Sequence, residues 1–528
     1  MGRRVRLRRV SLLLLVPLVL ALAAPETAQQ QRGSPAVTGA VQVTSNPEPV
    51  RAHSSPQIAV NPTNGELVVV ESDVRGSRSC SVHISVDEGR SWFRGGDPMV
   101  EPFSDCGFYA EYGPYATMAF ARDGTLYVAF VASEFLNRAR DATPRHVFLA
   151  RSEDGGRSFA TAKVYEAPDG NPDLGLNKGP MLAVDPTDPQ RVYVGWRQGV
   201  FRDAKEKLKS NIAASGDGGQ SFGPPVDLTD ERGGDYPGIA VDGRGVVHAV
   251  YWTRVFPPTP SDQPGPVRPI MYRHSPDKGT TWSEPVEVDP GNQAASRPAL
   301  LAADPTSDTL YVVWHGNAEP NNQAPDFQGD LDIFVRTSHD AGRSWSERVQ
   351  VNEDRGQANQ YEPGISIGPG GRVDIAWYDF RDSPVPPITS SGHSGDTGLS
   401  DIYYSWSTDG GRTFRPNIRV SDRSIDRSVG VWSNDIDSKF NIGIASTRDT
   451  VYVAWQDTRN AIRDTHAEDA YVASVRLGAV APASASRRDV PLWILLASGA
   501  ALGMGIAAVL AWILTRRATT RTLTAPVK

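Results

Sequence analysis

The sequence predicts an all-β protein, a β-propeller of four-stranded blades, from two observations. One is a unit of roughly 60 residues that recurs seven times, with short apolar strands joined by turns rich in Gly, Asp and Pro. The other is a short motif, S-x-D/E-x-G-x-S/T-W/F. Radial repetition of four-stranded units is typical of propellers. The six copies of the motif lie at Ser85–Trp92, Ser152–Phe159, Ser215–Phe222, Ser275–Trp282, Ser338–Trp345 and Ser407–Phe414.

The fifth unit shows the expected order of strands. It opens with "LLAA" at Leu300, and a second apolar strand, "LYVVW", follows at Leu310. A third strand, "DIFVRTS" at Asp332, leads into the motif, and "RVQV" at Arg348 comes after it. Short apolar runs bounded by turn residues are typical of strands. Each unit is therefore expected to form one blade.

The seventh unit is incomplete. It ends with "DAYVASVRLG" at Asp469 and has neither the motif nor a fourth strand. The chain begins its repeats with "AVQVTSNP" at Ala40, which resembles the fourth strand at Arg348. We expect this N-terminal strand to complete the seventh blade, because ring closure removes open sheet edges. A six-bladed ring is the alternative.

The motif falls between the third and fourth strands, where a hairpin turn is expected. Its Asp can accept hydrogen bonds from backbone N–H groups of the turn, and its Gly permits a backbone angle that a Cβ penalises. Its aromatic residue can pack into the blade. The second copy is expected to vary in register, because Glu153 and Asp154 both precede its glycines. Chemistry rarely needs one motif at six azimuths, so we interpret the motif as scaffold.

Apolar segments near both ends predict an exported, single-pass membrane protein with its propeller on the extracytoplasmic side. Five Arg precede an apolar run from Ser11 to Ala24, the pattern of a secretory signal, with an uncleaved anchor as the alternative. Val490–Thr515 carries no charge and is long enough to cross a bilayer. The expected organisation is signal peptide 1–24, flexible segment 25–38, propeller 39–478, linker 479–489, transmembrane helix 490–515 and cytoplasmic tail 516–528.

Composition narrows the function classes. The net charge of −7 and the short charge runs argue against nucleic acid as a partner. Export permits a disulfide between Cys80 and Cys106, with a free buried pair as the alternative. No HExxH or phosphate-binding glycine loop occurs, so no cofactor is expected. A structural Ca²⁺ in acidic loops such as "SGDTGLSD" stays open, and the oligomeric state is not predicted.

The connections between second and third strands are long and should gather on the face opposite the motif, where long loops usually carry binding. Tolerated insertions are the alternative. Three second strands end in D-x-R, and their arginines are suited to clamp a carboxylate. The other interpretation is that each Asp–Arg pair braces neighbouring blades. These pairs are Asp73/Arg75, Asp379/Arg381 and Asp457/Arg459.

The repeated motif resembles the Asp box, or BNR repeat, of the sialidase superfamily, and the resemblance covers roughly residues 40–478. It implies a propeller whose Asp boxes lie away from the active site. It also implies an exo-sialidase-type glycoside hydrolase in which three arginines bind a sugar carboxylate, a Tyr is the nucleophile, a Glu assists it and an Asp is the acid/base. The family's F/Y-R-I-P motif is replaced by "HSSPQIAV", with Ser54 at the Arg position, and Arg297 in "SRPALL" is the substitute candidate.

The resemblance implies one set of catalytic roles. Tyr361 would be the nucleophile and Glu362 its base, with Asp73 or Asp379 as the acid. The candidate carboxylate-binding residues are Arg75, Arg381, Arg459 and Arg297.

Two alternatives accompany this prediction. Asp235 and Tyr236 form a second Tyr/carboxylate candidate before another first strand, and Tyr-x-Pro in either place is otherwise a packing feature of the turn. The protein as a whole is otherwise a non-catalytic propeller that binds a glycan or a protein at the cell surface.

Overall fold

The structure is a computed structural model, and it is described here for part of the chain. The described residues are 35–45, 52–73, 79–103, 106, 116–133, 145–168, 177–199, 208–253, 268–291, 299–317, 331–355, 358–383, 398–430 and 441–478. All of their regular secondary structure is β-strand. Among these residues we find no helix long and apolar enough to cross a membrane, and the predicted signal peptide and 490–515 lie outside them.

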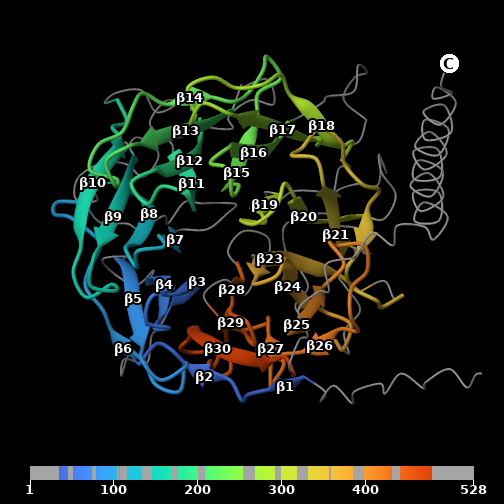
Figure 1. Cartoon of the computed structure of the whole chain (residues 1–528). Helices are drawn as coiled ribbons and strands as arrows, with labels where there is room; N and C mark the ends of the chain where they lie inside the picture. The colour runs from blue at the N-terminus through green and yellow to red at the C-terminus, as the bar shows by residue number, and fades with distance from the viewer. Residues whose placement is uncertain are drawn as a thin grey trace, which may run out of the picture.

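Seven antiparallel sheets stand around a common axis, as the strand labels in Figure 1 show. This confirms the all-β propeller with seven blades and replaces the six-bladed alternative. Blade 1 consists of β3 (His53–Val60), β4 (Leu67–Asp73), β5 (Ser79–Ser85) and β6 (Phe93–Arg94). Blade 2 consists of β7 (Ala116–Phe120), β8 (Leu126–Ala132), β9 (His146–Ser152) and β10 (Ala160–Tyr165). Blade 3 consists of β11 (Asn177–Val184), β12 (Val192–Gln198), β13 (Lys209–Ser215) and β14 (Val226–Asp227).

The later blades repeat this order from the first strand outward. Blade 4 consists of β15 (Asp235–Val241), β16 (Val247–Trp252), β17 (Ile270–Ser275) and β18 (Val286–Asp289), and blade 5 of β19 (Leu300–Ala303), β20 (Leu310–Asn317), β21 (Leu331–Ser338) and β22 (Val349–Gln350). Blade 6 consists of β23 (Gln360–Gly368), β24 (Arg372–Asp379), β25 (Leu399–Ser407), β26 (Ile418–Arg419) and β27 (Ile425–Asp426). Blade 7 consists of β28 (Gly443–Ser446), β29 (Thr450–Asp457) and β30 (Asp469–Arg476), together with β1 (Ala36–Val37) and β2 (Val41–Gln42).

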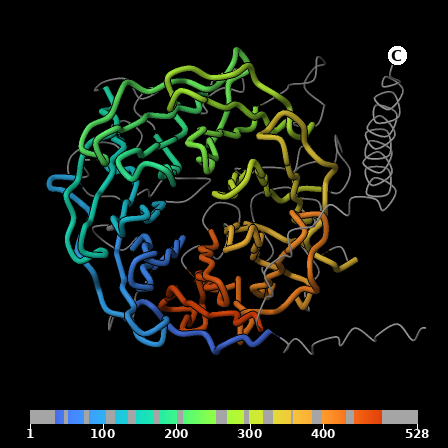
Figure 2. The backbone as a smooth tube through the Cα atoms, in the orientation of Figure 1, coloured from blue at the N-terminus to red at the C-terminus, as the bar shows by residue number. Residues whose placement is uncertain are grey.

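The ring is closed by strands from both ends of the propeller. Val41 pairs with Val472 of β30, so the N-terminal strand completes blade 7 as the sequence predicts. Ala36 of β1 also pairs with β30, at Arg476, three residues before the expected start of the propeller at 39. The backbone tube in Figure 2 brings the blue and red ends of the colour scale together at this blade.

The hydrophobic core is divided among the seven seams, a seam being the interface between two neighbouring blades. Each of the seven buried clusters draws its residues mainly from two adjacent blades. In six seams the aromatic residue of the motif packs against the cluster shared with the preceding blade. These residues are Trp92, Phe159, Phe222, Trp282, Trp345 and Phe414.

All six motifs form the same turn. In the first, Ser91 N and Oγ donate to the two carboxylate oxygens of Asp87 at 2.9 and 2.6 Å, and Gly89 N donates to Ser85 Oγ at 2.8 Å. The second copy keeps this register, contrary to expectation, because Asp154 and not Glu153 receives Ser158 N at 2.9 Å. The structure therefore supports the scaffold interpretation of the motif.

Seam 6/7 has no motif and is held by a different polar group. Arg372 Nη1 and Nη2 donate to the carbonyls of Arg448 and Thr447, in the turn between β28 and β29, at 2.7 and 2.8 Å. Asp374 accepts from Arg372 Nε at 2.9 Å and from Tyr404 Oη at 2.6 Å. Burial raises the pKa of Asp374 despite the arginine beside it. This buried group grips blade 7 on the face where the motif turns lie in the other blades.

Candidate functional site

The face opposite the motif turns, called the loop face below, carries a repeated distortion at the start of the first strands. The register of β3, β11, β15 and β23 with their neighbours slips by a bulge at this point. Each bulge contains a residue before Pro in the left-handed region: Ser55 at φ 53°, Gly179 at 55°, Tyr236 at 33° and Glu362 at 53°. First strands line the ring centre, so the bulges gather around the axis (Figure 1).

Three of these residues have a side chain that disfavours the conformation. A non-glycine residue in the left-handed region costs on the order of 1–3 kcal/mol, and such strain clusters at functional sites. Ser55, Tyr236 and Glu362 adopt this conformation in three different blades. Packing alone does not require three different polar side chains there, so the loop-face bulges are the candidate site.

At each of these three residues, a side chain from the second strand of the preceding blade contacts the bulge. Arg197 Nη1 donates to Tyr236 Oη at 3.2 Å. Glu362 N lies 3.4 Å from His315 Nδ1, and Ser55 N donates to Gln456 Oε1 at 3.3 Å. These three contacting residues occupy the same position in their blades, directly after the aromatic residue of the second strand in "GWR", "VWH" and "AWQ". They were not among the predicted site residues, although aligning the second strands identifies them.

Seam 3/4 contains the most strongly charged of these groups. Arg197 Nε lies 3.0 Å from Asp235 Oδ1, and its guanidinium lies 5.4 Å from the centre of the Tyr236 ring. Lys178 is the cross-strand partner of Arg197 in blade 3. The side chains of Arg197 and Asp235 are 3% and 2% exposed, so the ion pair is well shielded from solvent. The structure thus groups Asp235 and Tyr236 with the guanidinium of Arg197.

Tyr361 and Glu362 stand at the bulge of blade 6. The Tyr361 ring meets the His315 ring edge-on at 5.6 Å and the Phe380 ring at 5.8 Å. Both residues are buried. The Tyr361 ring is therefore held by aromatic contacts on two sides, as expected if Tyr-x-Pro is a packing feature of the turn. The same residue also lies near the axis of the ring.

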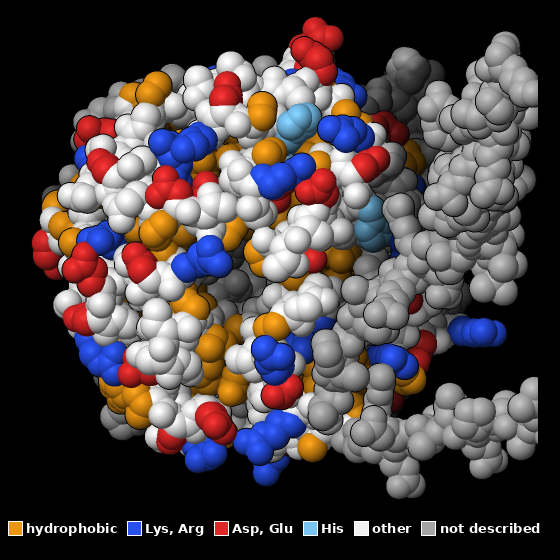
Figure 3. All heavy atoms as spheres, viewed as in Figure 1, with side chains coloured by type: hydrophobic (Ala, Val, Ile, Leu, Met, Phe, Trp, Pro, Cys, Tyr) orange, Lys and Arg blue, Asp and Glu red, His pale blue; other side chains and the backbone are white. Residues whose placement is uncertain are grey.

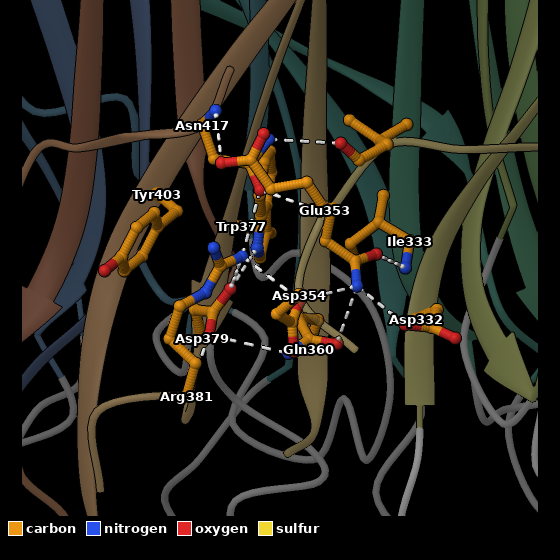
Figure 4. A network of polar contacts seen from close by, with 12 residues as sticks. Asp332, Ile333, Glu353, Asp354, Gln360, Trp377, Asp379, Arg381, Tyr403 and Asn417 are labelled. Atoms are coloured by element: carbon orange, nitrogen blue, oxygen red, sulfur yellow. Dashed lines mark hydrogen bonds and ion pairs between the residues drawn. The ribbon is translucent and has the colours of Figure 1, made fainter. Parts of the chain in front are cut away.

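The D-x-R residues form brackets that join the end of their own second strand to the segment after the fourth strand of the preceding blade. Figure 4 shows the bracket of blade 6, where Arg381 lies between Asp379, Asp354 and the face of Tyr403. Arg381 Nη2 donates to Asp379 Oδ2 at 2.7 Å and lies 3.3 Å from Asp354, and its guanidinium is 4.2 Å from the centre of the Tyr403 ring. Because Tyr403 belongs to the third strand, Arg381 lies outward from the axis.

Arg459 repeats this bracket in blade 7. Its Nη2 donates to Asp457 Oδ2 at 2.7 Å and lies 2.9 Å from Asp422, over the ring of Tyr471 at 4.1 Å. Each of these arginines thus contacts one Asp of its own blade and one Asp from the segment after the fourth strand of the preceding blade. For these two pairs the arrangement is the one expected of bracing between neighbouring blades.

The remaining predicted residues have less direct roles. Asp379 accepts from Trp377 Nε1 and from Arg381 N, both at 2.8 Å, so its carboxylate is part of the bracket. Asp73 is buried at the equivalent end of β4. Arg75 and Arg297 lie outside the described residues.

Blade 1 differs from the bracketed blades at one position. Glu71 stands where blades 6 and 7 have a buried Trp, and its Oε1 lies 3.1 Å from both His53 Nδ1 and His83 Nε2. Burial would raise the pKa of Glu71, but the two histidines outweigh it and lower that pKa to about 2. In the described part of the chain no group of three His, Cys, Asp or Glu side chains is suited to hold a metal ion.

Cys80 and Cys106 form a disulfide at the loop-face end of β5, with their Cα atoms 5.3 Å apart. Ser72 Oγ donates to the carbonyl of Cys106 at 3.0 Å, which fixes the segment after β6 over seam 1/2. Figure 3 shows one face of the ring, with acidic and basic side chains interspersed and a hollow near the centre.

Comparison with known proteins finds similar solved structures at low sequence identity. No protein-family model matches the chain, and no curated protein matches it significantly. Similar solved structures include a protein of unknown function from Dyadobacter fermentans, with 12% identity over 84% of this chain and 99% of that one and a TM-score of 0.45. A Hadza microbial sialidase has 15% identity over 75% and 73%, TM-score 0.42, and a PL25 ulvan lyase has 12% over 84% and 96%, TM-score 0.44.

Proposed function

We propose that the propeller is a carbohydrate-active protein that takes an acidic glycan at its loop face. The observation that carries this proposal is the ring of bulges, which holds Ser55, Tyr236 and Glu362 in strained conformations around the axis. The resemblance of the six motif turns to the Asp box of sialidases supports the same class of ligand. The described loop-face residues include phenol, carboxylate and cationic groups that can recognise a glycan.

The catalytic version of this proposal assigns glycoside hydrolysis to the bulge of blade 6. Tyr361 is the nucleophile and Glu362 assists it, as the resemblance implies. A phenol is suited to attack next to a substrate carboxylate because it is neutral before it loses its proton. Asp73 or Asp379 is the acid, as the resemblance also implies.

A non-catalytic glycan-binding propeller is the second candidate, and one observation favours it. Arg381 and Arg459, two of the arginines expected to clamp a carboxylate, are each held by two aspartates in separate blades. Without that clamp, a sialidase-type reaction lacks its expected anchor. The same acidic glycan would then be bound and released unchanged.

One experiment separates the two versions. The full-length chain is assayed for hydrolysis of a fluorogenic sialoside and for binding to a glycan array, beside Tyr361→Phe. The hydrolase version predicts turnover that falls by a factor of about 100 or more in the variant, since the nucleophile is lost. The binding version predicts no turnover but retention of acidic glycans by both proteins. Retention of none of the acidic glycans contradicts the proposed function.

We also propose that the propeller is exported and tethered to the membrane through 490–515. This rests on the charge-free apolar run in the sequence. Protease treatment of intact cells is expected to release a fragment of propeller size, and the fragment's absence from the medium would contradict an extracytoplasmic position.

A further inference from the structure

We propose that Asn64 is a site of spontaneous covalent modification, at which the side-chain amide is converted to a carboxylate through a cyclic imide. Asn64 and Gly65 lie in the turn between β3 and β4, on the motif face, and both residues are exposed. They form the one Asn–Gly step in the sequence. The site is independent of the proposed function, because it lies on the face opposite the candidate glycan site.

The reaction takes place within the chain and uses only water and hydroxide from the solvent. The backbone nitrogen of Gly65 loses its proton to hydroxide and attacks Cγ of Asn64, so that a new C–N bond closes a ring. The bond from Cγ to Nδ2 then breaks, and the side-chain nitrogen takes a proton from water and leaves as ammonia. Water opens the imide at either of its carbonyls, which gives aspartate or isoaspartate. Attack within one chain is favoured by the proximity of the two groups.

A hydrogen bond activates the carbonyl that is attacked. Glu66 N donates to Asn64 Oδ1 at 2.9 Å. Negative charge develops on this oxygen when Gly65 N adds to Cγ, and a backbone N–H directed at such an oxygen stabilises the transition state. The turn thus places a donor at the atom where the reaction needs one.

The space around Gly65 is open. Gly65 has φ 78°, and a Cβ built on it would meet no atom within 4 Å, so no side chain shields the attacking nitrogen. Gly65 N donates to the carbonyl of Asn61 at 2.9 Å, and this bond has to open before the attack. Exposed turns open locally at little cost in free energy. The nitrogen is therefore available for a fraction of the time in the folded protein.

The corresponding turn of blade 2 contains the product of this reaction. Asp123 and Gly124 stand there, with Gly124 at φ 88°, and Thr125 N donates to Asp123 Oδ1 at 3.0 Å. An aspartate at position 64 therefore fits the turn with the same hydrogen bond. Isoaspartate does not fit in this way, because its backbone runs through the side-chain carbon and is longer by one atom.

The test is peptide mapping by mass spectrometry of the full-length chain during incubation at mildly alkaline pH. The peptide that contains Asn64 is expected to gain the mass difference between an amide and a carboxylic acid. Its rate should lie within a factor of about 10 of the rate in a synthetic peptide of residues 60–68, because the turn opens at little cost. Asn64→Gln should keep its mass, since its ring would be larger and closes more slowly. Circular dichroism melts confirm that the variant is folded.

Asn460 is the matched control within the same chain. It is also exposed, but Ala461 follows it in place of a glycine. Its amide nitrogen, the leaving group of the reaction, donates to three acceptors, which are Gln42 Oε1 at 3.3 Å and Asp469 Oδ2 and Tyr471 Oη at 2.9 Å. The peptide that contains Asn460 should therefore keep its mass.

Three outcomes would overturn the proposal. One is an unchanged mass at Asn64 under conditions that convert the synthetic peptide. Another is conversion of Asn64 in the urea-denatured chain alone, because the folded turn would then protect the amide. The third is an equal gain at Asn64 and Asn460, since the turn would then add nothing to the reactivity.

Discussion

The two faces of the ring differ in how alike their blades are. On the motif face, six turns share the same hydrogen bonds and place an aromatic residue in the same part of a seam. On the loop face, the equivalent bulge residues are Ser55, Gly179, Tyr236 and Glu362. A position that makes the same packing contacts in every blade keeps the same type of residue. A position that has diverged from blade to blade is where recognition is expected.

A substitution at seam 6/7 is expected to have the largest effect on stability, because this seam lacks the motif that joins the other blades. Arg372→Met removes the guanidinium that grips the turn of blade 7 and leaves Asp374 buried without its cation. Breaking a buried pair in this way costs about 3–5 kcal/mol. Urea denaturation should show this loss in the free energy of unfolding. Arg372→Lys, which keeps the charge, should lose clearly less, and an equal loss would argue against an electrostatic role.

The motif turn gives the next largest effect. Gly342 has φ 84°, and a Cβ built on it would lie 2.2 Å from the Tyr272 ring. Gly342→Ala combines left-handed strain with overpacking and should cost about 2–4 kcal/mol.

Gly370→Ala is the matched control for that substitution. Gly370 has φ 80° with no atom within 4 Å of a built Cβ, so only the backbone strain remains. Thermal melts of the two variants separate the two contributions. Equal losses would show that the close approach of the turn to Tyr272 adds nothing to stability.

The loop-face bracket should respond in stability and not in binding. Arg381→Met removes the bond to Asp379 and the contact with Tyr403, which should lower the free energy of unfolding by about 1–3 kcal/mol. Affinity for an acidic sugar should stay within a factor of about 2. A large loss of affinity in a folded Arg381→Met protein would return the carboxylate to the arginine clamp.

The smallest effect concerns pH. Hydrogen bonds from Ser344 hold the pKa of Asp340 at about 2, below its ordinary value of 3.8. A lowered folded-state pKa stabilises the fold above the unfolded value, and this contribution is lost as pH falls through 3.8 toward 2. Solvent screening limits it to about 1 kcal/mol or less for this largely exposed group. Asp340→Asn should reduce the difference in stability between pH 6 and pH 2.5, and an unchanged difference would contradict it.

The sequence predicts the regular part of this molecule well. The recurrence of S-x-D-x-G identifies the turns because one local hydrogen-bond pattern needs those residue types in that order. The closure of blade 7 follows from the missing strand after Asp469, since an open edge must be paired.

The arrangement of the loop-face residues is harder to predict from the sequence. The D-x-R pattern shows that Arg381 and Asp379 are close along the chain, but only the position of Tyr403 shows that the arginine lies outward from the axis. The contact of Arg197 with Tyr236 joins residues 39 positions apart in two blades. No local pattern specifies such a contact, because it depends on which second strand faces which bulge.

The most direct test of the central claim is hydrogen–deuterium exchange of the full-length chain with and without tetragalacturonate or α2,3-sialyllactose. A glycan on the loop face is expected to slow exchange in peptides that cover 177–182 and 235–241. The six motif turns should exchange at the same rate with and without the sugar. Protection confined to the motif turns, or equal exchange everywhere under conditions where the sugar is bound, would contradict a binding site on the loop face.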